Sequence, residues 1–181
     1  IRFTFSFINS SISGCIDTQK VHISSAIASG YKYMLIVTSD EAKARKMCDD
    51  ASFFNKEAIY YPAKDAIFYS ADVHGNQITG ERLRCISRII NHSSTGEGVL
   101  TVVTTMDGIA DRLIPVERFK EAVITLDYSS EIEPEKLAKK LVAMGFVRTG
   151  MVEDKGQFAI RGGIIDIFSY TDEAPVRIEL W

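Results

Sequence analysis

The segment from Gly14 to Val21 has residues that could bind a phosphate group. It resembles the phosphate loop G-x-x-x-x-G-K-[ST], because Gly14 and Lys20 keep the required spacing. Gln19 replaces the second glycine, whose backbone must approach the phosphates, and Val21 replaces the hydroxyl that binds magnesium. Asp17 adds a negative charge where an anion would bind. We therefore expect neither nucleotide binding nor a cofactor, and a chance match of Gly14 and Lys20 leads to the same expectation.

No other pattern in the sequence predicts catalysis. There is no G-x-S-x-G motif, and the three histidines lie too far apart for an H-E-x-x-H metal site. The three cysteines form no C-x-x-C pair, so we expect reduced and mostly buried thiols. Asp166 lies within an apolar strand, where a perturbed pKa could indicate chemistry. The interpretation that we favour is structural, with Asp166 accepting hydrogen bonds from the backbone or from arginine.

The strand pair from Phe158 to Trp181 has the residue types of a protein-docking surface. Its last strand alternates, which places Val176, Ile178 and Leu180 on one face and Arg177, Glu179 and Trp181 on the other. Arginine and tryptophan are enriched in the energetic centres of protein interfaces. The alternative is that Arg177 and Glu179 pair locally while Trp181 covers a core.

Alternating strand-like and helix-like segments in the first two thirds predict an α/β layer with a parallel sheet. Ser39 or Asp40 can cap the second helix. The predicted elements, in chain order, are a helix ending near Gly30, a strand at 33–38, a helix at 41–50, a strand at 58–61, a helix at 78–90, a strand at 98–105 and a short helix to about residue 113.

After Pro115 the pattern changes to that of a smaller α+β module. The expected elements are a strand at 122–126, a helix at 134–144 that opens on Pro134, and only strands and turns from Phe146 onward. One long strand is predicted at 157–168, with a bulge or a close backbone contact at its adjacent glycines. We therefore predict two domains, at 1–117 and 118–181.

Composition limits the classes of partner. The chain has 181 residues, 46% of them apolar, with a net charge of −3 and a pI near 5.7, so it lacks the broad positive field of a nucleic-acid-binding protein. Arg82, Arg84 and Arg88 are spread around the helix at 78–90, and we expect a solvated face there rather than phosphate contacts. No segment has the pattern of a membrane span or a signal peptide, which favours a cytoplasmic protein.

The sequence R-G-G-I-I-D-I-F at 161–168, followed by V-R-I-E-L at 176–180, resembles domain 2 of UvrB and its counterpart in the transcription-repair coupling factor (Mfd) family. The segments 61–65, 72–76 and 99–115 also resemble the amino-terminal region of that family, so the resemblance extends from about Ser13 to the end of the chain. The altered phosphate loop favours the coupling factors over UvrB, which needs an intact loop.

The resemblance implies a phosphate-loop NTPase-like α/β layer with a degenerate loop, and a second domain that binds UvrA. It places Arg161, Arg177 and Trp181 at positions similar to the UvrA contacts of the family, with Glu179 beside them. Two departures are Ala159, where UvrB typically has arginine, and Trp181, where phenylalanine is usual.

The family role that follows is recruitment of nucleotide excision repair to RNA polymerase stalled at a DNA lesion. Full-length family members also carry a polymerase-binding domain and an ATP-driven DNA translocase, so we expect a non-catalytic, monomeric fragment. Two alternatives remain open. One is a damaged-DNA-binding module that uses the Arg82 helix, and the other is a nucleotide hydrolase that uses Lys20.

Overall fold

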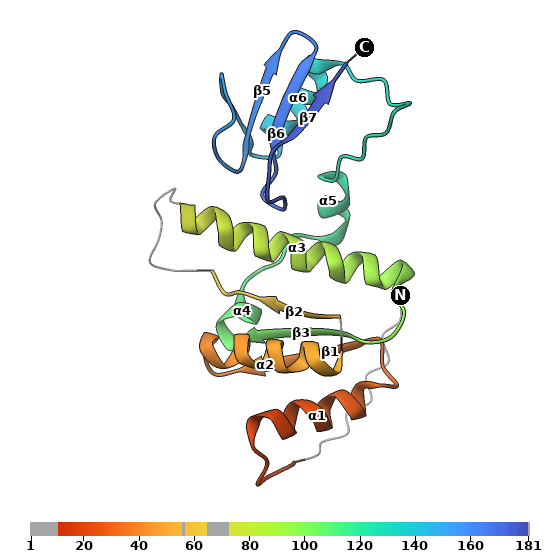
Figure 1. Cartoon of the computed structure of the whole chain (residues 1–181), viewed down its shortest axis with the longest axis vertical. Coiled ribbons are helices and arrows are strands. Elements are labelled where there is room, and N and C mark those ends of the chain that lie inside the picture. Colours follow the sequence, from red (N-terminus) through yellow and green to blue (C-terminus); the bar gives the residue numbers. More distant parts are fainter. Residues whose placement is uncertain (1–10, 56, 65–72, 181) are drawn as a thin grey trace.

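The computed structural model describes residues 11–55, 57–64 and 73–180, which form an α/β layer followed by a C-terminal module (Figure 1). Trp181 lies outside these ranges, as do residue 65 of the segment 61–65 and residue 72 of the segment 72–76, which carry part of the family resemblance. Among the described helices, none combines the length and the hydropathy of a membrane span.

The α/β layer is built on a parallel three-stranded sheet. Its strand order is β1-β3-β2, with β3 in the centre, which confirms the predicted fold class for this part of the chain. Five of the six β3 residues are buried, as expected of a central strand. The strands are β1 (Tyr33–Thr38), β2 (Ala58–Tyr61) and β3 (Leu100–Thr105), the last beginning two residues later than predicted.

Helices cover both faces of this sheet (Figure 1). The helices are α1 (Asp17–Ala28), α2 (Glu41–Phe54), α3 (Val73–Thr95) and α4 (Met106–Ala110). Cys48 of α2 packs with Val103 on one face, and Cys85 of α3 packs with Leu100 on the other. The Asp40 side chain caps α2 by accepting a 2.8 Å hydrogen bond from the Lys43 backbone N–H, as predicted. Both α2 and α3 extend beyond their predicted ends, because each residue added to an existing helix gains a backbone hydrogen bond without a new nucleation cost.

The C-terminal module packs helix α6 (Pro134–Ala143) against a four-stranded sheet. Its core contains Leu137 and Leu141 of α6 together with Phe146, Phe158 and Ile165, and Phe158 and Ile165 are fully buried. The strand order is β4-β5-β6-β7, formed by β4 (Val147–Arg148), β5 (Gln157–Arg161), β6 (Ile164–Phe168) and β7 (Val176–Glu179).

The predicted long strand at 157–168 is wrong, because β5 and β6 are two antiparallel strands joined at Gly162 and Gly163. Gly162 has φ +61°, a conformation that favours glycine, so the pair forms a tight turn instead of a bulge. The alternative expectation of a close backbone contact is confirmed. The Leu180 N–H donates to the Gly163 carbonyl at 2.8 Å, and a Cβ at position 163 would lie 3.2 Å from the Leu180 carbonyl oxygen.

The predicted strand at 122–126 is also wrong. Helix α5 (Val116–Glu121) ends just before it and spans the predicted domain boundary, and the chain from 123 to 133 forms neither helix nor strand. Ile124 and Ile132 pack against the module core, whereas Val123 and Leu126 are exposed. Apolar residues therefore attach this segment to the module without strand pairing.

Helix α3 contacts the C-terminal module at Gly80. A Cβ at this position would collide with the backbone carbonyl oxygen of Tyr170, in the turn after β6. The ring of Tyr170 lies edge-on to Phe146 with centroids 5.7 Å apart, and its hydroxyl occupies the space that a Cβ at Gly156 would need. The turn that meets α3 is thus fixed within its own module.

Candidate docking site

The four-stranded sheet presents one face to α6 and the other outward. Strand register pairs Asp166 in β6 with Ala159 in β5 and with Arg177 in β7. Arg161 lies two residues beyond Ala159 and therefore shares its face. Three strands thus place Arg161, Asp166 and Arg177 together on the outer face, although 16 positions separate the two arginines in the sequence.

These three side chains form a hydrogen-bonded cluster that we call the arginine clamp. The Arg161 Nη2 donates to Asp166 Oδ2 at 2.7 Å. The Arg177 Nε donates to Oδ1 at 2.7 Å, and its Nη2 donates to Oδ2 at 3.1 Å, which makes a bidentate pair. The side chain of Asp166 is 12% exposed, whereas those of Arg161 and Arg177 are 49% and 55% exposed. The clamp therefore holds two solvent-facing cations on one buried anion.

The electrostatics of the clamp favour its charged form. Hydrogen bonding from Arg177 lowers the pKa of the Asp166 carboxyl, and the smaller contribution of Arg161 acts in the same direction against the effect of burial. The same contact raises the pKa of Arg177. The expectation that Asp166 accepts arginine hydrogen bonds is confirmed, and Arg177 pairs with Asp166 rather than locally with Glu179.

The rest of the strand pair agrees with its predicted faces in part. Glu179 is exposed and lies on the outer face, two residues beyond Arg177. Ile178 and Leu180 pack against the module core as predicted. Val176 pairs with the core-packed Ile167 and so lies on the predicted face, but it is 50% exposed. This strand is at the edge of the sheet.

The loop that resembles a phosphate site leads directly into α1. Gly14 has φ +79°, and the Gln19 side chain accepts a 3.2 Å hydrogen bond from the Ile16 backbone N–H. The Lys20 ammonium pairs with Asp17 at 3.1 Å, and this pairing lowers the pKa of Asp17. Val21 is fully buried. The helix start is thus occupied by its own side chains, and its lysine already has a carboxylate partner.

Arg82 is buried, so the expectation of a solvated face is wrong at this position. Its Nη1 donates to the Pro62 carbonyl at 2.7 Å and lies 3.0 Å from Asp111 Oδ2. Its guanidinium also lies 4.4 Å from the centre of the Tyr61 ring. Arg88 on the same helix is exposed and pairs with Glu57 at 2.5 Å. The buried position arises because the end of β2 supplies a carbonyl and an aromatic ring at this point of α3.

The three cysteines are free thiols, two of them buried. Cys48 and Cys85 are buried, which agrees with the expectation of mostly buried thiols, and Cys15 is half-buried. Burial raises the pKa of the Cys85 thiol to about 12. Within the described ranges, no three histidine, cysteine or acidic residues are grouped as metal ligands.

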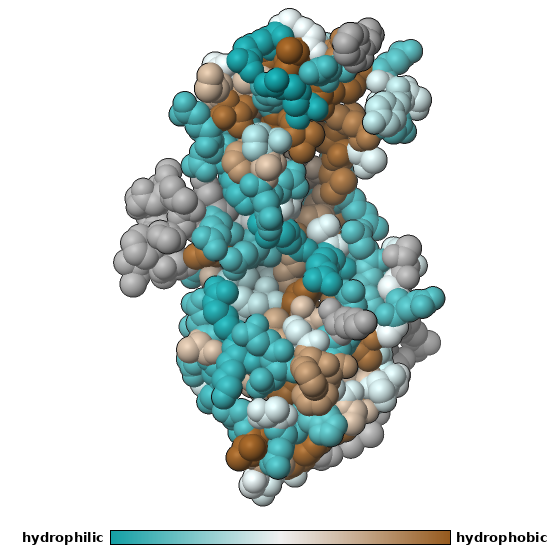
Figure 2. Space-filling model, in the orientation of Figure 1, coloured by the Kyte–Doolittle hydropathy of each residue, from teal (hydrophilic) through white to brown (hydrophobic). Residues whose placement is uncertain are grey.

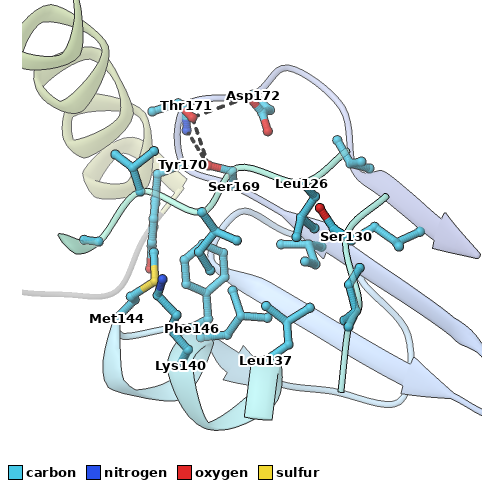
Figure 3. Close-up of a pocket in the computed structure, with 18 of the residues that line it drawn as sticks. Leu126, Ser130, Leu137, Lys140, Met144, Phe146, Ser169, Tyr170, Thr171 and Asp172 are labelled. Atoms are coloured by element: carbon cyan, nitrogen blue, oxygen red, sulfur yellow. Dashed lines mark hydrogen bonds between the residues drawn. The ribbon is translucent and has the colours of Figure 1, made fainter. Parts of the chain in front are cut away.

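Sequence reasoning missed a groove of about 1800 Å³ that is lined by α3, α5, the segment after α5, α6 and β7. Figure 3 shows Leu137, Met144 and Phe146 around it, together with the turn at Ser169–Asp172. Its apolar lining contributes to the hydrophobic surface of the C-terminal module that Figure 2 shows in brown, reaching toward the α/β layer. The apolar residues in the segment between α5 and α6 were the sequence signal that could have indicated this groove.

Comparison with known proteins places the clamp inside a recognised domain. Residues 124–181 match the family model of the UvrB interaction domain, a protein-interaction module. This part of the chain is similar to UvrB interaction domains. The matched range contains α6, all four strands of the second sheet and the whole arginine clamp.

The full chain is similar to transcription-repair-coupling factors. It is 36% identical to the factor of Bacillus subtilis (strain 168) over 152 residues, which cover 83% of this chain and 12% of that protein. It is 31% identical to the factor of Staphylococcus aureus (strain USA300) over 180 residues, which cover 98% of this chain and 15% of that protein. The predicted resemblance is thereby confirmed, and the chain spans 12% to 15% of the length of these relatives.

Proposed function

We propose that this chain is a non-catalytic adaptor that binds UvrA through the outer face of its C-terminal module. The observation that carries the proposal is the arginine clamp, which holds two half-exposed guanidinium groups on a rigid sheet within a UvrB interaction domain. Each guanidinium has five N–H donors, and the clamp uses one from Arg161 and two from Arg177. Donors remain for carboxylates or carbonyls of a partner.

The charges of this surface suit a partner surface that carries both positive and negative groups, rather than a purely acidic one. Two arginines and Asp166 give the clamp a net charge of +1, and the exposed Glu179 beside it adds a negative charge. Such a pattern supports a directional interface in which hydrogen bonds fix the register of the two proteins. Trp181, which lies outside the described residues, is proposed as an apolar contact with the same partner.

The role in the cell follows from the similarity to transcription-repair-coupling factors. As part of a longer protein that engages RNA polymerase and DNA, the module would bring UvrA, and with it nucleotide excision repair, to a polymerase stalled at a lesion. In this proposal residues 1–117 are a phosphate-loop NTPase-like layer that has lost nucleotide binding. The pairing of Lys20 with Asp17 and the capping role of Gln19 support that loss.

The test is the affinity of the protein for purified UvrA, measured by calorimetry. Arg161→Ala and Arg177→Ala should each weaken binding by about 2–5 kcal/mol, the usual loss when one partner of a buried charged contact is removed. Arg148→Ala is the matched control, because Arg148 is an exposed arginine on β4 of the same sheet and lies outside the clamp. Unchanged affinity in both clamp variants, with circular dichroism spectra like that of the parent, would overturn the proposal.

A further inference from the structure

We propose that Asp166 is a positioning residue, which sets the affinity for the partner by holding Arg161 and Arg177 in their binding conformations without contacting the partner itself. This inference rests on the proposed docking function. It assigns a role to the one carboxylate at the centre of the outer face.

The geometry keeps Asp166 from contacting the partner directly. Its side chain is only 12% exposed, and its two oxygens already accept three hydrogen bonds from the arginines. A partner approaching this face meets the guanidinium groups first, since about half of each arginine side chain is exposed. Asp166 can therefore act on the partner only through Arg161 and Arg177.

The two arginines need such a holder because they come from strands that are not neighbours. Arg161 ends β5 and Arg177 lies in β7, and β6 separates these strands. Both Nη2 atoms bind the same oxygen, Oδ2, so two like charges lie close together only because a negative charge lies between them. Without the carboxylate, repulsion would drive the two side chains apart.

Holding the arginines before binding lowers the entropy cost of the complex. A free arginine side chain samples many rotamers, and ordering it at an interface opposes association. The bidentate bond to Asp166 fixes the plane of the Arg177 guanidinium, and with it the direction of its remaining N–H groups. The partner thus meets donors whose orientation has already been set.

The test is a double-mutant cycle on UvrA affinity. Asp166→Asn keeps the size of the side chain and removes its charge, and we expect binding to weaken about tenfold, the order lost when two side chains must be ordered on binding. In the Arg161→Ala/Arg177→Ala background the same substitution should change the affinity less than twofold, because the groups through which it acts are gone. Glu173→Gln is the control, since it removes one exposed negative charge from the same module and should leave affinity unchanged.

The outcomes separate this inference from the proposed function. If the arginine variants do not weaken binding, the docking proposal itself fails. If they weaken binding and Asp166→Asn leaves it unchanged or strengthens it, the proposal for Asp166 fails alone. An equal effect of Asp166→Asn in both backgrounds would show a merely structural role and would also overturn it.

A second variant covers the case in which Asp166→Asn does not fold. Arg177→Lys keeps the positive charge but cannot make the bidentate bond, so binding should weaken several-fold. Parent-like affinity of this variant would contradict the positioning role.

Discussion

Replacing Gly80 with alanine should destabilise the protein, although alanine is the better helix former. At an ordinary site in a helix, alanine is favoured over glycine by about 1 kcal/mol. At Gly80 the added Cβ would collide with the Tyr170 carbonyl oxygen, a backbone group that cannot rotate away. Overpacking of this kind costs about 1–3 kcal/mol, so we expect a net loss of about 1 kcal/mol. For a chain of this size, that corresponds to a Tm lower by about 2–4 °C in thermal unfolding followed by circular dichroism.

The neighbouring residue Thr79 supplies the matched control. Thr79 is exposed on the same helix, so Thr79→Ala should stabilise the protein by about 0.5 kcal/mol through helix propensity alone. The two substitutions are therefore expected to shift Tm in opposite directions. A similar rise in both variants would refute the contact between α3 and the turn after β6.

Two further perturbations test the buried charges. Arg82→Ala should lower the free energy of unfolding by about 3–5 kcal/mol in urea denaturation, because it leaves Asp111 without its buried partner. Arg88→Ala should lower it by less than about 1 kcal/mol, since the ion pair of Arg88 is exposed. Equal losses in the two variants would contradict this account. The pKa of Asp166 is lowered in the folded state, so the stability that it contributes is complete above its unfolded pKa of about 3.9 and is lost as the pH falls through the lower folded value. Urea midpoints of the parent and of Asp166→Asn should differ by a constant amount from pH 7 to pH 5 and converge in stronger acid, and a difference that grows as the pH falls would rule out the clamp as its source.

Hydrophobic periodicity was enough to predict most of the α/β layer. The apolar run at 33–38 is a strand, but three of its residues are exposed, so the expectation of a buried strand is wrong. The short run ending at Pro62 is also a strand, and Asp40 caps α2, because each of these signals is local. The hairpin was not predictable in the same way. Gly162 and Gly163 lie between two apolar runs of the same alternation, so the sequence pattern is compatible with one continuous strand, and only the pairing of β5 with β6 decides between them.

The candidate site was predictable as a set of residues but not as a cluster. Alternation placed Arg177 and Glu179 on one face, and the family resemblance added Arg161, but neither shows that both arginines share Asp166. That contact depends on the register of three strands, which is a long-range property. Arg82 illustrates the same limit, because its burial arises from Tyr61, Pro62 and Asp111, which lie 20 or more positions away in the sequence.

The small side chain at Ala159 determines how many cations the clamp can hold. Ala159 is 1% exposed and faces Asp166 directly across the β5–β6 pair. An arginine at this position, which the resemblance to UvrB would lead one to expect, would add a third positive charge around a carboxylate that already accepts from two. Related docking surfaces with the same backbone can therefore differ in the ratio of cations to buried anions, that is, in how many positively charged side chains surround one buried carboxylate. Ala159 fixes that ratio at two to one in this chain.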